Sequence, residues 1–234
     1  MATAPTRELK RSARLQISRG MKTVLAGTII LYIASAFFAP TSISKVAQMG
    51  MLPFAACLAI VGLGQTLVIQ QGGIDLSVAG AVSLTVVIVT WGPDRNDDRL
   101  MPAVAAAFAA AIITGLVNGF LVTKTKLNSI VATLGVNALL YGVMMGLSGG
   151  SPRRTTERLS NFANDKTFGL PHSIYFGIIL TIVVTVLLKR TVFGRRFEAV
   201  GANPRAAHAT GLKIIRYQIG AYVCAQILYC AAGV

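Results

Sequence analysis

Charged residues are scarce in this chain, and acidic residues are the scarcest of them. Only 13% of the 234 residues are charged, 8 of them are aspartate or glutamate, and 54% are hydrophobic. A soluble domain of this length needs a surface that is richer in charge. The composition therefore excludes an ordinary soluble protein and is typical of a polytopic membrane protein.

Cysteine and histidine are also rare. Cys57, Cys224 and Cys230 all lie in apolar runs, which favours small hydrophobic side chains over a disulfide framework. His172 and His208 are isolated, so no cluster of histidine, cysteine and carboxylate has metal-ligand spacing. The sequence also lacks a Gly-x-x-x-x-Gly-Lys-Ser/Thr motif and any arguable Ser/His/Asp arrangement. We therefore expect no catalytic residues, no metal site and no cofactor bound by this chain.

Long apolar runs, by contrast, fill the sequence. A membrane-spanning helix needs about 20 apolar residues, with a range of roughly 17–25, and most of the runs meet this length. Seven runs cover residues 23–39, 52–70, 76–91, 101–123, 128–147, 172–188 and 217–234, of which the third is short. Gly115 and Gly119, and likewise Gly142, Gly146 and Gly150, have the four-residue spacing that favours close helix packing. The expected fold is an all-α polytopic membrane protein, a bundle of about seven visible helices.

Basic residues outnumber acidic residues by 22 to 8. If the N-terminus is cytoplasmic, 15 basic residues fall on the cytoplasmic side and 7 on the outer side, as the positive-inside rule requires. Topology then explains the positive charge, and we expect no nucleic-acid partner. Residues 1–22 form a basic cytoplasmic tail, either an amphipathic helix on anionic membrane lipid or a disordered segment, and residues 23–234 form the transmembrane domain. A cleavable signal peptide ending near Ala34-Ser35-Ala36 is the alternative for the N-terminus.

Asp75 is the conspicuous ionisable residue, because it lies between the second and third apolar runs. A carboxylate near membrane depth is costly and is by default a functional hypothesis. The alternative is that Asp75 caps the third helix, where free N–H groups and the positive end of the helix dipole meet it. Gly72 and Gly73 would allow the tight turn that so short a connection needs.

Polar residues within the apolar runs permit two interpretations. They could line a path for a hydroxyl-rich solute, or they could join helices through hydrogen bonds worth about 0.6 kcal/mol each. Together with the turn before the third run, they give the candidates for a translocation path: Gln65, Gly72, Gly73, Asp75, Asn118, Thr133 and Asn137. Because charged pairs are nearly absent from the runs, an ion-coupled mechanism is the weaker alternative.

A basic segment at residues 189–216 separates the last two apolar runs and contains a short, well-defined helix. Asn203 suits the N-cap position, Pro204 the first helical position and Gly211 the C′ position. A capped helix just outside the membrane indicates an element presented to a partner. An ordinary connecting loop is the alternative.

Three segments in order carry a resemblance to a known family. They are residues 64–69 followed by Gly-Gly-Ile-Asp-Leu-Ser at 72–77; Asn-Ser-Ile-Val-Ala-Thr-Leu-Gly at 128–135 with Leu-Ser-Gly-Gly at 147–150; and residues 191–211, which include Phe-Gly-Arg-Arg and Ala-Val-Gly-Ala-Asn. Together they resemble the permease subunits of ATP-binding-cassette (ABC) sugar importers of the ribose, galactose and arabinose type, over about residues 20–234. Gln70-Gln71 and Asn128-Ser129 depart from the family pattern, which leaves the sugar open.

The resemblance implies the fold of a truncated 10-helix importer permease, in a bacterial inner membrane. It also implies a cytoplasmic ATPase subunit that binds ATP and Mg²⁺, a periplasmic sugar-binding protein, and a second permease subunit in a homo- or heterodimer. The element that couples the permease to the ATPase would lie in the 189–216 loop, at Gly194, Arg195, Glu198, Gly201, Asn203, Ala206, Ala207 and Gly211. Because the sequence ends inside an apolar run, we expect a fragment that does not transport by itself.

The expected function is thus that of a permease subunit that translocates a pentose- or hexose-like sugar and is not itself an enzyme. An ion-coupled secondary transporter of a small polar solute is the main alternative. A scaffold or receptor subunit and an intramembrane enzyme are weaker ones, and the sequence offers no catalytic pair for the latter.

Overall fold

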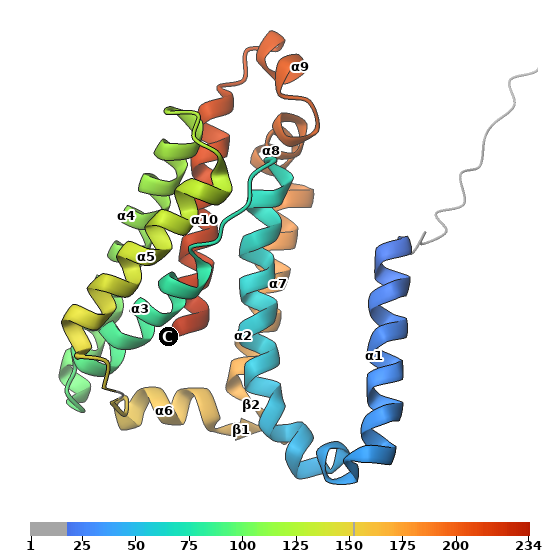
Figure 1. The fold of residues 1–234 in the computed structure, drawn as a ribbon, viewed down its shortest axis with the longest axis vertical. Helices are drawn as coiled ribbons and strands as arrows, with labels where there is room; N and C mark the ends of the chain where they lie inside the picture. The colour runs from blue at the N-terminus through green and yellow to red at the C-terminus, as the bar shows by residue number, and fades with distance from the viewer. Residues whose placement is uncertain (1–17, 152) are drawn as a thin grey trace, which may run out of the picture. The chain divides into compact units, whose positions relative to one another are not determined.

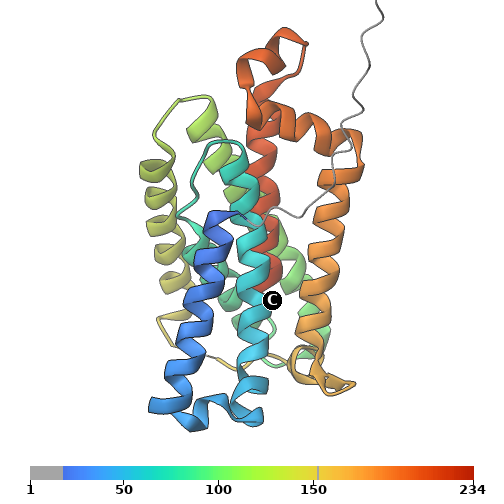
Figure 2. The ribbon, with the colours of Figure 1, turned by 90° about the vertical axis from the view of Figure 1, so that its right-hand side faces the viewer.

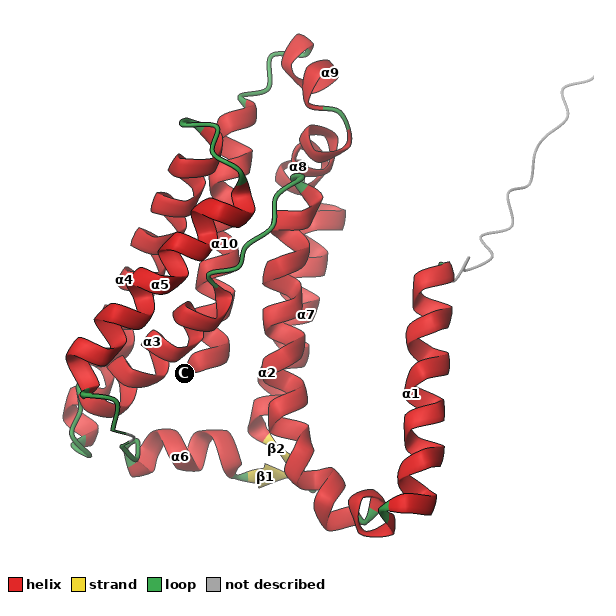
Figure 3. Cartoon of the chain, in the orientation of Figure 1, coloured by secondary structure: helices red, strands yellow, loops and turns green. Residues whose placement is uncertain are grey.

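The computed structural model describes residues 18–151 and 153–234. Most of the predicted basic tail, residues 1–17, therefore lies outside the described part of the chain. Most of the described chain is helical (Figure 3). It divides into two compact units, Met1–Gly50 and Met51–Val234.

The first unit contains α1 (Arg19–Phe38), the 3₁₀ helix η1 (Pro40–Ile43) and the start of α2 (Lys45–Gln70). Ser18 caps α1 by accepting a hydrogen bond from the N–H of Met21 (3.2 Å). None of the residues of α1 is buried, as expected for an apolar helix that faces lipid. Within this unit, the Tyr32 hydroxyl donates to Oε1 of Gln48 (2.9 Å).

The second unit contains the remainder of α2 and the rest of the chain (Figure 1). Its further elements are α3 (Val78–Trp91), η2 (Asp97–Arg99), α4 (Leu100–Thr123), α5 (Ser129–Ser148), α6 (Glu157–Asn164), β1 (Lys166–Thr167), β2 (Leu170–Pro171), α7 (His172–Arg190), α8 (Val192–Ala202), α9 (Pro204–Ala209) and α10 (Ile214–Gly233). The two short strands pair antiparallel, with Lys166 opposite Pro171. α6 and this hairpin lie at the opposite end of the unit from α8 and α9 (Figure 1).

The core of this unit forms around α10. Tyr222 and Tyr229 from α10 pack with Val68 of α2, Leu84 of α3 and other buried residues. α4 approaches α10 closely, because a Cβ on Gly115 would lie 2.5 Å from Cα of Val223. The predicted packing role of Gly115 and Gly119 is thus confirmed.

The second small-residue pattern, on α5, behaves differently. In the described chain, a Cβ on Gly142 or Gly146 would meet nothing within 4 Å. These two glycines therefore do not bring α5 against another helix of this unit. The prediction of close packing is wrong for them, because this face of α5 is exposed.

The all-α polytopic membrane fold is confirmed, but the described helices differ in how well they suit a membrane. Five are long and apolar enough to span it: Arg19–Phe38, Lys45–Gln70, Asp97–Thr123 (which includes η2), Ser129–Ser148 and His172–Arg190. α3 has only 14 residues, because the chain enters it from a non-helical segment inside the bundle. α10 is 20 residues long, but its arginine, glutamines and tyrosines make it more polar than the other long helices.

Candidate functional site

The segment that joins α2 to α3 begins with a Schellman motif at the end of α2. The N–H of Gly73 donates to the carbonyl of Val68 (3.1 Å), and the N–H of Gly72 donates to the carbonyl of Ile69 (2.9 Å). Gly72 has φ +78°, a left-handed conformation that costs glycine little. The first glycine of the pair thus ends the helix.

The second glycine makes room for α10. A Cβ on Gly73 would overlap the hydroxyl oxygen of Tyr222 and lie 3.1 Å from Cγ1 of Val68. Tyr222 is only 2% exposed. The turn therefore packs directly against a buried aromatic side chain that is 149 residues away in the sequence.

α5 holds the backbone that follows the turn. Oγ1 of Thr133 accepts a hydrogen bond from the N–H of Leu76 (2.9 Å), and Oδ1 of Asn137 accepts one from the N–H of Gly80 (2.8 Å). Within a membrane, non-helical backbone is tolerated only where protein groups satisfy its hydrogen bonds. Thr133 and Asn137 fill this requirement at the entrance to α3.

Asp75 is the centre of a buried hydrogen-bond cluster. Its Oδ1 accepts from the N–H (2.9 Å) and the hydroxyl (2.6 Å) of Ser77, and its Oδ2 accepts from Nε2 of Gln226 (3.0 Å). The Ser77 hydroxyl oxygen also accepts from Asn118 (2.8 Å) and Gln226 (2.7 Å). Nε2 of Gln65 donates to the carbonyl of Asp75 (2.5 Å). Side chains from α2, α4 and α10 thus converge at the start of α3.

Asp75 is fully buried, and in the described chain no lysine or arginine pairs with it. It lies at the start of α3, as the capping interpretation expects. Its partners, however, are Ser77 and Gln226 rather than the N–H groups of the first helical turn. Hydrogen bonds alone compensate the carboxylate.

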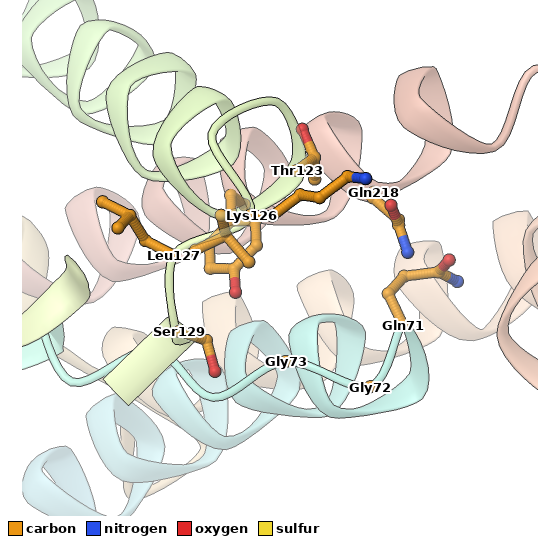
Figure 4. Close-up of a pocket in the computed structure, with 10 residues that line it drawn as sticks. Gln71, Gly72, Gly73, Thr123, Lys126, Leu127, Ser129 and Gln218 are labelled. Carbon is orange, nitrogen blue, oxygen red and sulfur yellow. The ribbon is translucent and has the colours of Figure 1, made fainter. Parts of the chain in front are cut away.

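A polar pocket of about 380 Å³ lies beside this turn (Figure 4). Amides, hydroxyls and one amine supply its hydrogen-bonding groups. The lining residues are Gln71, Gly72, Gly73, Val122, Thr123, Lys126, Leu127, Ser129, Gln218 and Tyr222. Lys126, Gln218 and Gln71 extend toward one another across the opening (Figure 4). Such a lining suits a small, uncharged solute that is rich in hydroxyl groups.

Of the seven sequence-predicted path residues, only Gly72 and Gly73 line this pocket. Asp75 is part of the α2–α3 segment instead, and Gln65, Asn118, Thr133 and Asn137 form hydrogen bonds to that segment or to the first turn of α3. The sequence did not reveal Gln218 and Tyr222 as pocket residues, because only the packing of α10 brings them to the turn. Gln71 carried a weak signal as a departure from the family pattern.

The basic 189–216 segment contains two helices, whereas the sequence predicted one. Thr191 caps α8 by accepting from the N–H of Gly194 (3.0 Å). A Cβ on Gly194 would overlap the carbonyl of Leu188, so the bend from α7 into α8 requires glycine. Arg195, Glu198 and Gly201 lie on α8 rather than in a loop. The Glu198 carboxylate forms an ion pair with Lys189 (2.6 Å).

The short capped helix α9 has the predicted ends. Oδ1 of Asn203 accepts from the N–H of Ala206 (3.1 Å), and Pro204 occupies the first turn. Gly211 has φ +83°, and a Schellman pattern closes the helix. Ala206 is exposed and Ala207 is buried. α9 projects past the long helices of the second unit, near the start of α10 (Figure 2).

The fold and these sites define a class: a polytopic helical membrane protein with a short helix that begins inside the bundle. Residues 48–234 match the family described as the branched-chain amino acid transport system / permease component. The chain belongs to this family, and no solved structure matches it.

The relatives include sugar permeases. The chain is 29% identical to the ribose import permease protein RbsC of Bacillus subtilis (88% of this chain, 65% of that protein). It is 29% identical to the L-arabinose transport system permease protein AraH of Escherichia coli (92% and 65%) and 31% identical to the probable ABC transporter permease protein y4mJ of Sinorhizobium fredii (89% and 63%). The predicted resemblance to this group is confirmed. The chain spans about 65% of the length of the first two relatives.

Proposed function

We propose that this chain is the membrane-spanning permease subunit of an ATP-driven importer of a pentose- or hexose-like sugar. The observation that carries the proposal is the polar pocket beside the Gly72–Ser77 segment. Its amides and hydroxyls match the hydrogen-bonding groups of a sugar, and its volume lies within the usual range of about 300–1,000 Å³ for small-molecule sites. The names of the ribose and arabinose relatives support this substrate class.

The pocket is lined by Lys126 and by Gln218 near the start of α10, which belong to the basic end of the second unit. On the positive-inside rule, this end is cytoplasmic. The pocket is then the inner part of the translocation path. The other path candidates, Gln65, Asp75, Asn118, Thr133 and Asn137, fix the shape of its wall without touching the solute.

The partners follow from the family. A periplasmic binding protein delivers the sugar at the outer face, a second permease subunit completes the path, and a cytoplasmic ATPase that holds ATP and Mg²⁺ drives the cycle. This chain catalyses no reaction itself. The assembly lies in a bacterial inner membrane, with the N-terminus of the chain in the cytoplasm and membrane lipid around its helices.

α9 is the element that docks on the ATPase. Its exposed Ala206 and its capped ends give a small, rigid surface at the basic end of the unit. Gly194, Arg195, Glu198 and Gly201 set the position of this surface through α8, whereas Asn203, Ala207 and Gly211 define α9 itself.

Sugar uptake into proteoliposomes that contain the complete importer tests whether the pocket residues contact the transported sugar. Gln218→Ala and Lys126→Met each remove a hydrogen-bonding group that lines it. Since losing such a group costs about 1–3 kcal/mol, we expect the half-saturating sugar concentration to rise at least about fivefold. Thr66→Ala is the control, because Thr66 lies on α2, is exposed, and bonds only to the carbonyl of Gly62 among the described residues. Unchanged uptake in both pocket variants would contradict the assignment.

A further inference from the structure

α8 meets the end of α2 at a close backbone contact. Gly201 lies in the last turn of α8, and a Cβ on it would overlap the carbonyl oxygen of Gln70, the last residue of α2. Only glycine permits this approach without a shift of one helix. The contact fixes the position of α8 against the residue that precedes the α2–α3 turn.

A buried side-chain hydrogen bond reinforces this contact. Nε2 of Gln71 donates to the carbonyl of Phe197 on α8 (2.9 Å), across 126 residues of sequence. Both residues are buried, with exposed fractions of 9% for Gln71 and 3% for Phe197. Water cannot readily replace a buried hydrogen bond, so breaking it leaves the amide N–H group of Gln71 desolvated and without a partner. The bond therefore favours joint movement of Gln71 and α8.

Gln71 also forms part of the pocket wall and directly precedes Gly72 and Gly73. At the same end of α8 as Gly201, a single residue, Asn203, separates α8 from α9. The chain of contacts thus runs from the exposed helix α9 through α8 to Gln71 and on to the glycine turn. Each step is a covalent link or a buried contact within the second unit.

We propose that Gln71 is a positioning residue that transmits displacement of α8 to the pocket wall. This inference rests on the proposed function, since α9 is taken as the element that the ATPase moves. When α8 shifts, the Gln71–Phe197 hydrogen bond and the Gly201–Gln70 contact move the end of α2. The turn at Gly72 and Gly73 follows, and the inner pocket changes shape.

The experiment measures sugar transported per ATP hydrolysed by the complete importer in proteoliposomes. Gln71→Met keeps the length of the side chain but removes the donor to Phe197. We expect the sugar-to-ATP ratio to fall, because α8 can then move without moving the pocket wall at Gln71. Because Gln71 also lines the pocket, the sugar-to-ATP ratio, and not the half-saturating concentration, carries the test. Gln70→Met is the matched control, because no side-chain hydrogen bond joins Gln70 to α8 in the described chain, and its ratio should be unchanged.

Gly201→Ala provides a second route to the same result, since it pushes α8 from α2 without substituting a residue that lines the pocket. Gly220→Ala is its control, because a Cβ there would meet nothing within 4 Å in the described chain. We expect Gly201→Ala to lower the ratio and Gly220→Ala to leave it unchanged.

Several results would overturn the inference. They are an unchanged ratio in Gln71→Met and Gly201→Ala, an equal fall in either control, or a raised half-saturating concentration at an unchanged ratio, which would make Gln71 a simple contact with the sugar. If the wild type shows no sugar-stimulated ATP hydrolysis, the proposed function fails, and the inference fails with it. A normal wild type with normal variants rejects only the role of Gln71.

Discussion

At the scale of single residues, the structure explains the residue type at several positions of the Gly-Gly-Ile-Asp-Leu-Ser segment, residues 72–77. Gly72 supplies the left-handed conformation that ends α2, and Gly73 leaves room for Tyr222. Asp75 and Ser77 join three helices through a fully buried cluster. Ile74 has no such constraint, because its side chain is 43% exposed.

The contact between Gly73 and Tyr222 yields a stability prediction. Gly73→Ala introduces a Cβ that overlaps the Tyr222 hydroxyl oxygen, and overpacking of this kind costs typically about 1–3 kcal/mol. We expect a lower apparent Tm for the purified protein in detergent. Tyr222→Phe removes the overlapping oxygen, so the double variant should regain much of the loss. If Gly73→Ala is as stable as the wild type, or if Tyr222→Phe gives no rescue, the packing described for the turn is incorrect.

Sequence alone predicts the turn but not its surroundings. Two adjacent glycines before a carboxylate indicate a tight, non-helical connection, and the structure contains one. The approach of Tyr222 and Gln226 from α10 depends on packing between segments about 150 residues apart. No local pattern encodes such a contact, so these partners of Gly73 and Asp75 become visible only in the folded chain.

At the scale of elements, the short helices α3, α8 and α9 form the candidate sites, whereas the long helices form the membrane-spanning bundle. α3 begins inside the bundle, because side chains of α2, α4, α5 and α10 satisfy the polar groups at its start. α9 is defined from the sequence by Asn203, Pro204 and Gly211, since caps act over a few residues. The sequence did not predict α8, because its two buried apolar residues, Phe197 and Val200, are too few to indicate a buried face among basic neighbours.

The exposed side of α9 yields a coupling prediction. Ala206→Asp adds a carboxylate to an exposed position near the N-terminus of the helix, which α9 tolerates electrostatically. We expect normal membrane insertion but loss of most ATPase binding, measured by co-purification of the two subunits. Ala207→Asp should instead lower the yield of folded protein, because Ala207 is 5% exposed. Full ATPase binding by Ala206→Asp would show that α9 does not form the docking surface.

At the scale of the whole molecule, hydropathy predicted the class of fold, and the distribution of basic residues predicted which loops lie on the cytoplasmic side of the membrane. The five long apolar helices and the family match agree with that class. What the pattern could not predict is the order in which helices contact one another. α10, one of the more polar helices, occupies the centre of the second unit, where its tyrosines pack in the apolar core and Gln226 bonds to Asp75 and Ser77.

The most direct test of the whole account is the rate of ATP hydrolysis by the complete importer in proteoliposomes, with its binding protein present and with or without ribose or arabinose. We predict that one of these sugars, or a related pentose or hexose, stimulates hydrolysis, and that uptake of the same sugar persists when ionophores remove ion gradients. Hydrolysis that no sugar alters, together with uptake that ionophores abolish, would contradict the account. That result would favour an ion-coupled transporter in which Asp75 is the residue that binds the ion.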